Sequence, residues 1–163
     1  MSRRSDMHGF TLIELMIVVV LLGIFAAIAV PSFTQFINNN RTQAANNEVF
    51  ALLQYARSTA VAQRATISVC PDDDAWSVKE KDCTAAEILR SMEVTGGTSI
   101  NSSVGEIAFR HNGSSATPAT IVTCRQDDFA NGYTIKVASA GSIRTYPRGK
   151  SGTDGSDYMD GCE

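Results

Sequence analysis

The chain has few of the residues that metal sites and hydrolytic active sites require. Among its 163 residues are two histidines, His8 and His111. Its four cysteines form no C-x-x-C pair, so the usual ligand spacing of a zinc site is missing. It contains no Gly-x-Ser-x-Gly, Walker or His-Glu-x-x-His sequence. We therefore expect no catalytic residue, no metal and no cofactor, and we do not expect an enzyme.

The chain also lacks an excess of positive charge. It has 14 basic and 17 acidic residues and a formal net charge of −3. Such a balance does not favour nucleic acid or anionic lipid as a partner, although a local basic patch remains compatible with it. Its acidic loops, at residues 72–74 and at Asp154, Asp157 and Asp160, do not have the spacing of an EF-hand. We interpret them as solvated loops.

The chain does have a long apolar run, which lies near the N-terminus. In residues 10–30 the polar side chains are those of Thr11 and Glu14. As a helix this run would span about 30 Å, which is the thickness of a bilayer's hydrocarbon core. Because Arg3 and Arg4 precede it, the N-terminus is predicted to stay cytoplasmic while the remainder crosses outward. Residues 10–30 are therefore predicted to be a transmembrane helix.

Glu14 is the unexpected residue in this run. A charge near the centre of a membrane helix costs about 2.5–3.5 kcal/mol on insertion scales, so such a residue usually has a partner. The small residue Gly9 comes before the apolar run, whereas a secretory signal carries its cleavage site after it. Cleavage after Gly9 would create a free amine at Phe10, close enough to pair with the carboxylate of Glu14.

The sequence "GFTLIEL" at residues 9–15 resembles the class III signal of type IV pilins and type II secretion pseudopilins. The resemblance implies that residues 1–9 are a leader and that a prepilin peptidase cuts between Gly9 and Phe10. It also implies that the same enzyme methylates the Phe10 amine. Glu14 would then pair with the Phe10 amine of a neighbouring subunit during filament assembly.

The helical pattern continues beyond residue 30. Pro31 removes a backbone donor and is expected to kink the helix. In residues 31–63 the pattern becomes amphipathic, which predicts one helix over residues 10–63 whose second half packs on the following domain. A strict heptad, as a coiled coil needs, is missing. The expected apolar face comprises Phe33, Phe36, Ile37, Ala44, Ala45, Val49, Leu52, Leu53, Ala56 and Ala60. The expected polar face comprises Asn38, Asn39, Arg41, Asn46, Glu48, Arg57 and Gln63.

The sequence pattern of residues 64–163 is typical of a β-rich domain. Seven short segments are rich in β-branched and aromatic residues: "TISVC", "AWSVK", "RSMEV", "EIAFR", "ATIVTC", "YTIKVAS" and "SIRTYP". Glycine-containing turns separate several of them, and no long helix intervenes, so we expect antiparallel sheets. Residues 84–90 are expected to add a helical turn. The predicted class is α+β: a long N-terminal helix packed on an antiparallel two-sheet domain.

A second resemblance lies in this β-rich part. "EIAFRHNGSSATPATIVTC", followed by "NGYTIKVASAGSIRTY", resembles the domain of the GspH/FimT group of minor pilins and pseudopilins. The resemblance implies a periplasmic domain anchored in the inner membrane of a Gram-negative bacterium, which later enters an extracellular pilus. It also implies four kinds of partner: other minor pilins, the major pilin, the prepilin peptidase and the inner-membrane assembly platform.

The even number of cysteines and the membrane-targeted start favour disulfides. Taken in chain order, Cys70 would pair with Cys83, and Cys124 with Cys162, but four cysteines allow three connectivities. Each bond would contribute about 3 kcal/mol by loop entropy, less any strain.

Three functions remain open within this group. The first is a FimU-like minor pilin that primes pilus assembly, forms part of the tip and supports twitching motility and adhesion. The second is a GspH-like minor pseudopilin of type II secretion. The third is a FimT-like pilin that binds DNA for transformation, through Arg144, Arg148 and Lys150 around Tyr146. Against the third, Ser142 replaces the first arginine of the Gly-Arg-x-Arg pattern found in the DNA-binding members.

Overall fold

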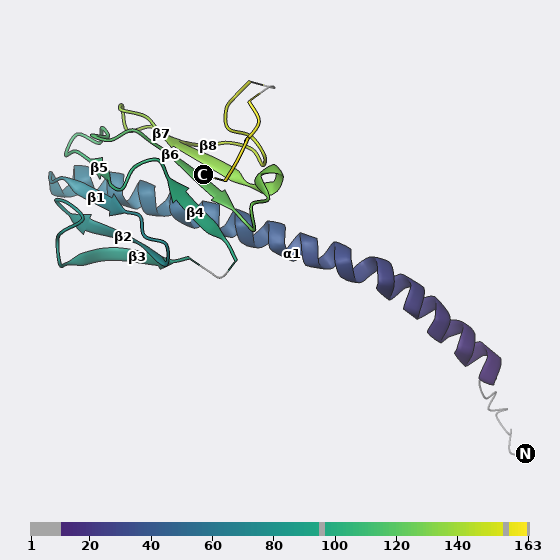
Figure 1. The fold of residues 1–163 in the computed structure, drawn as a ribbon. Coiled ribbons are helices and arrows are strands. Elements are labelled where there is room, and N and C mark those ends of the chain that lie inside the picture. The colour runs from purple at the N-terminus through teal and green to yellow at the C-terminus, as the bar shows by residue number, and fades with distance from the viewer. Residues whose placement is uncertain (1–10, 95–96, 155–156, 163) are drawn as a thin grey trace, which may run out of the picture. The chain divides into compact units, whose positions relative to one another are not determined.

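The computed structural model describes residues 11–94, 97–154 and 157–162. Gly9 and Phe10, the predicted processing residues, therefore lie outside the described residues. One helix, α1 (Leu12–Gln63), is followed by eight strands and a 3-10 helix, η1 (Phe129–Asn131). The chain divides into two compact units, Met1–Ile37 and Asn38–Glu163. Figure 1 shows the helix and the strands.

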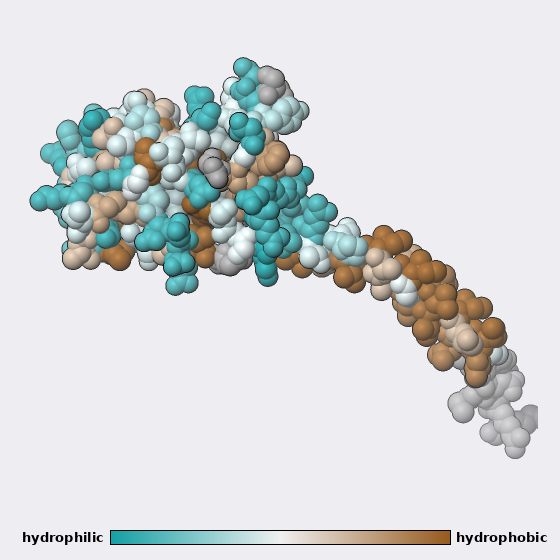
Figure 2. All heavy atoms as spheres, in the orientation of Figure 1, coloured by the Kyte–Doolittle hydropathy of each residue, from teal (hydrophilic) through white to brown (hydrophobic). Residues whose placement is uncertain are grey.

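The described part of the first unit is the N-terminal stretch of α1. Its large apolar side chains are exposed all round the helix, and Figure 2 shows this surface as hydrophobic. Among the described residues, α1 is the helix that is long and apolar enough to cross a membrane. Pro31 lies inside α1, which continues on both sides of it. The kink expected at Pro31 stays a prediction.

In the second unit, α1 buries one narrow stripe. Its buried residues recur at steps of three and four, as a helix packed on one side requires: Thr42, Ala45, Asn46, Val49, Leu52, Leu53, Ala56 and Ala60. Two details of the expected faces are wrong. Phe33, Phe36, Ile37 and Ala44 are exposed, because the stripe begins at Thr42 and Ala44 points away from it. Asn46 is buried, because it lies one helical turn after Thr42.

The strands form two four-stranded sheets in which every pairing is antiparallel. The first sheet has the order β3 (Ile88–Glu93), β2 (Ala75–Glu80), β1 (Ile67–Cys70), β5 (Ile107–Phe109). The second has the order β4 (Ser99–Ser102), β6 (Ala119–Cys124), β7 (Tyr133–Val137), β8 (Ile143–Thr145). The predicted α+β class, with a long helix and two antiparallel sheets, is confirmed.

Two local expectations differ from the structure. The strand β4 was not expected, because its sequence "SINS" offers one apolar residue, the buried Ile100. The helical turn expected at residues 84–90 is wrong, since Ile88 to Arg90 belong to β3. The Asp82 carboxylate accepts hydrogen bonds from the backbone N–H and the hydroxyl of Thr84. These local bonds compete with helical ones and favour a turn instead.

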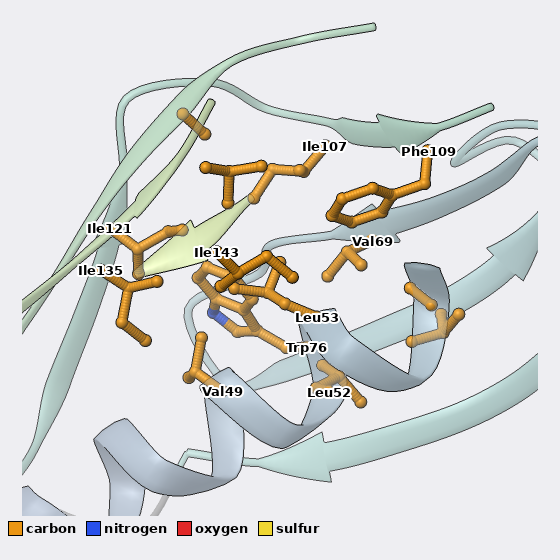
Figure 3. Close-up of a cluster of buried hydrophobic side chains, with 14 of the residues drawn as sticks. Val49, Leu52, Leu53, Val69, Trp76, Ile107, Phe109, Ile121, Ile135 and Ile143 are labelled. Atoms are coloured by element: carbon orange, nitrogen blue, oxygen red, sulfur yellow. The ribbon is translucent and has the colours of Figure 1, made fainter. Parts of the chain in front are cut away.

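The core of the second unit joins α1 to both sheets. Figure 3 shows Val49 and Leu53 of α1 close to Trp76, which comes from β2 and has no exposed surface. The first sheet adds Val69, Ile107 and Phe109, and the second adds Ile121, Ile135 and Ile143. Burial of these side chains, each worth about 1.5–3 kcal/mol, holds the helix and the two sheets together as one core.

Two disulfides close loops in the second unit. Cys70 is bonded to Cys83 and Cys124 to Cys162, which are the pairings by chain order. The second bond fastens the C-terminal segment to β6, where Met159 and Cys162 pack on Val122 and Cys124. Asn101 Nδ2 of β4 also donates to the carbonyl oxygen of Cys162, at 2.5 Å. The end of the chain is thereby held against the second sheet.

Candidate assembly and binding surfaces

Glu14 lies in the first turn of α1 and is exposed. Its backbone N–H is 3.3 Å from the hydroxyl oxygen of Thr11, which precedes the helix. A threonine oxygen at this position satisfies one of the free N–H groups of a helix start, and an acid there is favoured by the helix dipole. The carboxylate of Glu14 is therefore compatible with the helix and available to another molecule.

The exposed apolar stretch that follows Glu14 is the largest candidate contact surface of the first unit. Phe25, Ile28 and Phe33 each leave two-thirds or more of their surface exposed. An apolar surface of this length is typical of a membrane or protein contact. The arrangement can therefore serve as a membrane anchor and as a surface for packing against other apolar helices.

The four residues considered for DNA binding do not form one group. Arg144 and Tyr146 line a pocket of about 480 Å³ on the second sheet, together with Lys136. Arg148 does not line this pocket, and Lys150 Nζ instead lies 3.1 Å from the centroid of the Tyr158 ring. Of the three cations expected around Tyr146, only Arg144 therefore lines the same pocket as Tyr146.

Sequence reasoning missed Lys136 as a member of this pocket. In "YTIKV" it alternates with Ile135 and Val137, which are buried, so Lys136 is on the opposite, outward face of β7. The register then places Lys136 directly beside Arg144 of β8 and Thr120 of β6. The alternation was visible in the sequence, but the neighbours across the strands were not.

No catalytic constellation is found in the described part of the chain. His111 is exposed in the turn after β5, and no three His, Cys, Asp or Glu residues among those described are placed to hold a metal ion. Hydrogen bonds from the Thr84 hydroxyl and backbone lower the pKa of Asp82. Asp82 is a turn residue, and its lowered pKa is explained by this turn.

Comparison with protein families gives two matches. The family described as "Type II transport protein GspH" matches residues 45–141, which cover most of the stripe of α1 and most strands of both sheets. The "Prokaryotic N-terminal methylation motif" matches residues 4–30, which contain the apolar run and Glu14.

Curated relatives and solved structures are pilins and a pseudopilin. A fimbrial protein of Pseudomonas aeruginosa is 30% identical over 74% of this chain and 80% of its own length. A type IV major alpha-pilin of Moraxella bovis is 30% identical over 75% of this chain and 73% of its own. The crystal structure of the type IV minor pilin FimU of Pseudomonas aeruginosa is similar with a TM-score of 0.66 and 27% identity, covering 78% of this chain and 99% of FimU. The minor pseudopilin EpsH of Vibrio cholerae shares the fold, with a TM-score of 0.52, 10% identity, and coverage of 65% and 96%.

Proposed function

We propose that this chain, which belongs to the GspH family of pilin-like proteins, is a minor pilin of a type IV pilus. The observation that carries the proposal is the similarity to the minor pilin FimU, which extends over 99% of that chain. The family consists of structural pilin subunits, and the geometry agrees with such a role, since an exposed apolar helix and a compact domain suit packing between subunits. The chain would help prime assembly and form part of the pilus tip, in support of twitching motility and adhesion.

The N-terminal residues would act in sequence. A prepilin peptidase would cut after Gly9 and methylate the Phe10 amine, while residues 10–30 anchor the chain in the inner membrane. Residues 64–163 would face the periplasm until the assembly platform moves the subunit into the pilus. Glu14, exposed at the start of α1, would then neutralise the Phe10 amine of a neighbouring pilin and remove two charges from an apolar surrounding.

A deletion strain complemented with the full chain tests the proposal. We expect the deletion to reduce surface pili and twitching motility, and protein secretion to stay normal. Quantitative mass spectrometry of sheared pili should find the chain far below the amount of major pilin. A secretion defect with normal pili would favour the pseudopilin role, and an amount equal to the major pilin would contradict a minor role. Loss of DNA uptake with normal motility would favour the DNA-binding role.

Substitution of Glu14 tests its role in assembly. Glu14→Ala should insert into the membrane normally, because it removes a charge from an apolar helix, but enter sheared pili at a strongly reduced level. Glu48→Ala is the matched control, since Glu48 is another exposed acid of α1, and it should enter at the normal level. Pili are sheared, washed and probed for each variant against its membrane-bound amount. Normal entry of Glu14→Ala would show that the carboxylate has no pairing role.

A further inference from the structure

The outward face of the second sheet is divided into a covered part and an open part. The C-terminal segment covers the part around Val122 and Cys124, where the disulfide and the packing of Met159 hold it. The remaining part carries the pocket of about 480 Å³ lined by Lys136 and Arg144. This open part is bounded by hydroxyl groups of Ser103, Thr120 and Ser142. It is a concave surface with both polar and apolar lining residues, and the described part of the chain leaves it uncovered.

The two cations of this pocket, Lys136 and Arg144, repel each other across neighbouring strands. Lys136 and Arg144 are direct cross-strand partners in the antiparallel pair β7–β8, and both are exposed. Like charges directly opposite each other destabilise a sheet. Within the described residues neither side chain has a carboxylate partner, and Lys136 Nζ rests 5.5 Å from the centroid of the Tyr146 ring. The ring of Tyr146 attracts Lys136 weakly, but within the described residues no carboxylate offsets the repulsion between the two cations, and a partly compensated local cost of this kind is typical of a functional site.

The chemistry of the pocket suits a carboxylate. A guanidinium donates two parallel hydrogen bonds to a carboxylate, and an ammonium beside it adds a second positive charge. An anion between Lys136 and Arg144 would attract both cations and so offset the repulsion between them. The neighbouring hydroxyls can donate to the same oxygens, and Tyr146 offers an apolar side.

A nucleic acid strand suits this pocket less well. Binding of a phosphate backbone depends on a line of cations, each neutralising one phosphate. Here the two further cations of the late segment, Arg148 and Lys150, do not extend the pocket. The chain also has a net charge of −3, which repels a polyanion at longer range. Two adjacent cations with no further cation beside them fit one or two acidic side chains better than a strand.

We propose that this pocket receives an acidic loop of the adjacent pilin in the assembled pilus, with a carboxylate held between Lys136 and Arg144. The proposal rests on the proposed pilin function. This chain shows that a pilin domain of this fold can present such a loop, because Asp72, Asp73 and Asp74 are exposed between β1 and β2. A contact between two different surfaces of successive subunits is also the kind that generates a filament.

Neutralising variants separate docking from folding. Lys136→Gln/Arg144→Gln removes the repulsion between the two strands, so its unfolding temperature should equal or exceed that of the wild type. Its amount in sheared pili should nevertheless fall about tenfold or more, as expected when a docking charge pair is lost. Arg148→Gln, an exposed cation outside the pocket, is the control and should enter pili normally. Normal entry of the double variant while the wild type is incorporated would overturn the docking proposal alone. Absence of the wild type from pili would instead contradict the proposed function.

The partner is identified by cross-linking in cells. A photoreactive amino acid replacing Thr120, at the edge of the pocket, should cross-link the full chain to a pilin peptide that contains Asp or Glu. Reversal of that acid to lysine should restore the incorporation of Lys136→Glu/Arg144→Glu. A cross-link to a peptide without acids, or failure of the reversal to restore incorporation, would contradict the proposal. Cross-linking to DNA, together with DNA uptake lost in the double variant and retained in Arg148→Gln, would assign the pocket to nucleic acid instead.

Discussion

The two parts of α1 have the same secondary structure, yet the first part has more aliphatic residues than the second and leaves them exposed. In residues 12–37 apolar side chains surround the helix and stay exposed. From Thr42 onward, polar residues occupy most of the surface, and a single stripe is fully buried against both sheets. A helix that is apolar all round needs a surrounding membrane or other helices, whereas a striped helix needs one partner surface.

The number and the pattern of apolar residues together indicate what a helix packs against. The first part leaves its hydrophobic surface exposed. The second part uses its stripe for the stability of its own domain. Mutations in the two parts should therefore affect different properties.

The largest expected difference concerns two leucines of the same helix. Leu53 is fully buried and Leu22 is 61% exposed. Leu53→Ala should lower the free energy of unfolding by about 2–5 kcal/mol, because it leaves a cavity in the core. Leu22→Ala should change it by about 0.5 kcal/mol or less. Denaturant unfolding of the full chain in detergent micelles, followed by the fluorescence of the single, buried Trp76, measures both. If both variants lost the same free energy of unfolding, residues 12–37 would contribute to the stability of the core, and the two parts of α1 would not differ in this respect.

The disulfides, both located in the second unit, give the next effect. Cys124→Ser/Cys162→Ser should lower the free energy of unfolding by about 2–4 kcal/mol. The bond spans 38 residues, whereas Cys70–Cys83 spans 13. Loop entropy alone makes the longer loop worth about 1 kcal/mol more. Comparing both double variants by denaturant unfolding tests this order. A larger loss from the shorter loop would mean that packing around Cys70, not chain entropy, dominates.

Features with local causes could be predicted from the sequence. The continuous apolar run and the three- and four-residue steps indicated α1, and alternation in segments such as "YTIKV" indicated strands. Features that depend on contacts between residues far apart in the sequence could not be predicted. Ile100 alone did not reveal β4, Asn46 was assigned to the polar face by its chemistry, and the proximity of Lys136 to Arg144 depends on strand register.

Asn46 offers a smaller and sharper test of where the buried stripe lies. Its Nδ2 donates to Thr145 Oγ1 of β8 at 3.2 Å, while its neighbour Asn47 is exposed. Replacement of either by alanine brings the same gain in helix propensity, so the difference between them isolates the tertiary contact. Asn46→Ala should be less stable than Asn47→Ala by about 1 kcal/mol. The same unfolding assay measures this difference. If Asn47→Ala were the less stable variant, the assigned stripe would be rotated.

The smallest expected effect is the acid sensitivity that Asp82 gives to the second unit. The Thr84 hydroxyl, and then its backbone N–H, favour the charged carboxylate and so hold the pKa of Asp82 below its ordinary value. Because the pKa is lower in the folded state, this contribution to stability is present above the ordinary pKa of an aspartate. It is lost as the pH falls through the lowered pKa of the folded state.

Asp82→Asn should therefore reduce the loss of stability between about pH 7 and about pH 2. Thr84→Val, which keeps the carboxylate and removes the hydroxyl, should have part of the same effect. Thermal unfolding of both variants and the wild type over this pH range measures the slopes. Because Asp82 lies at the surface of a turn, the change should be smaller than that of Asn46→Ala. An unchanged pH dependence in Asp82→Asn would show that the turn contributes nothing to the acid response, and that other carboxylates of the chain produce it.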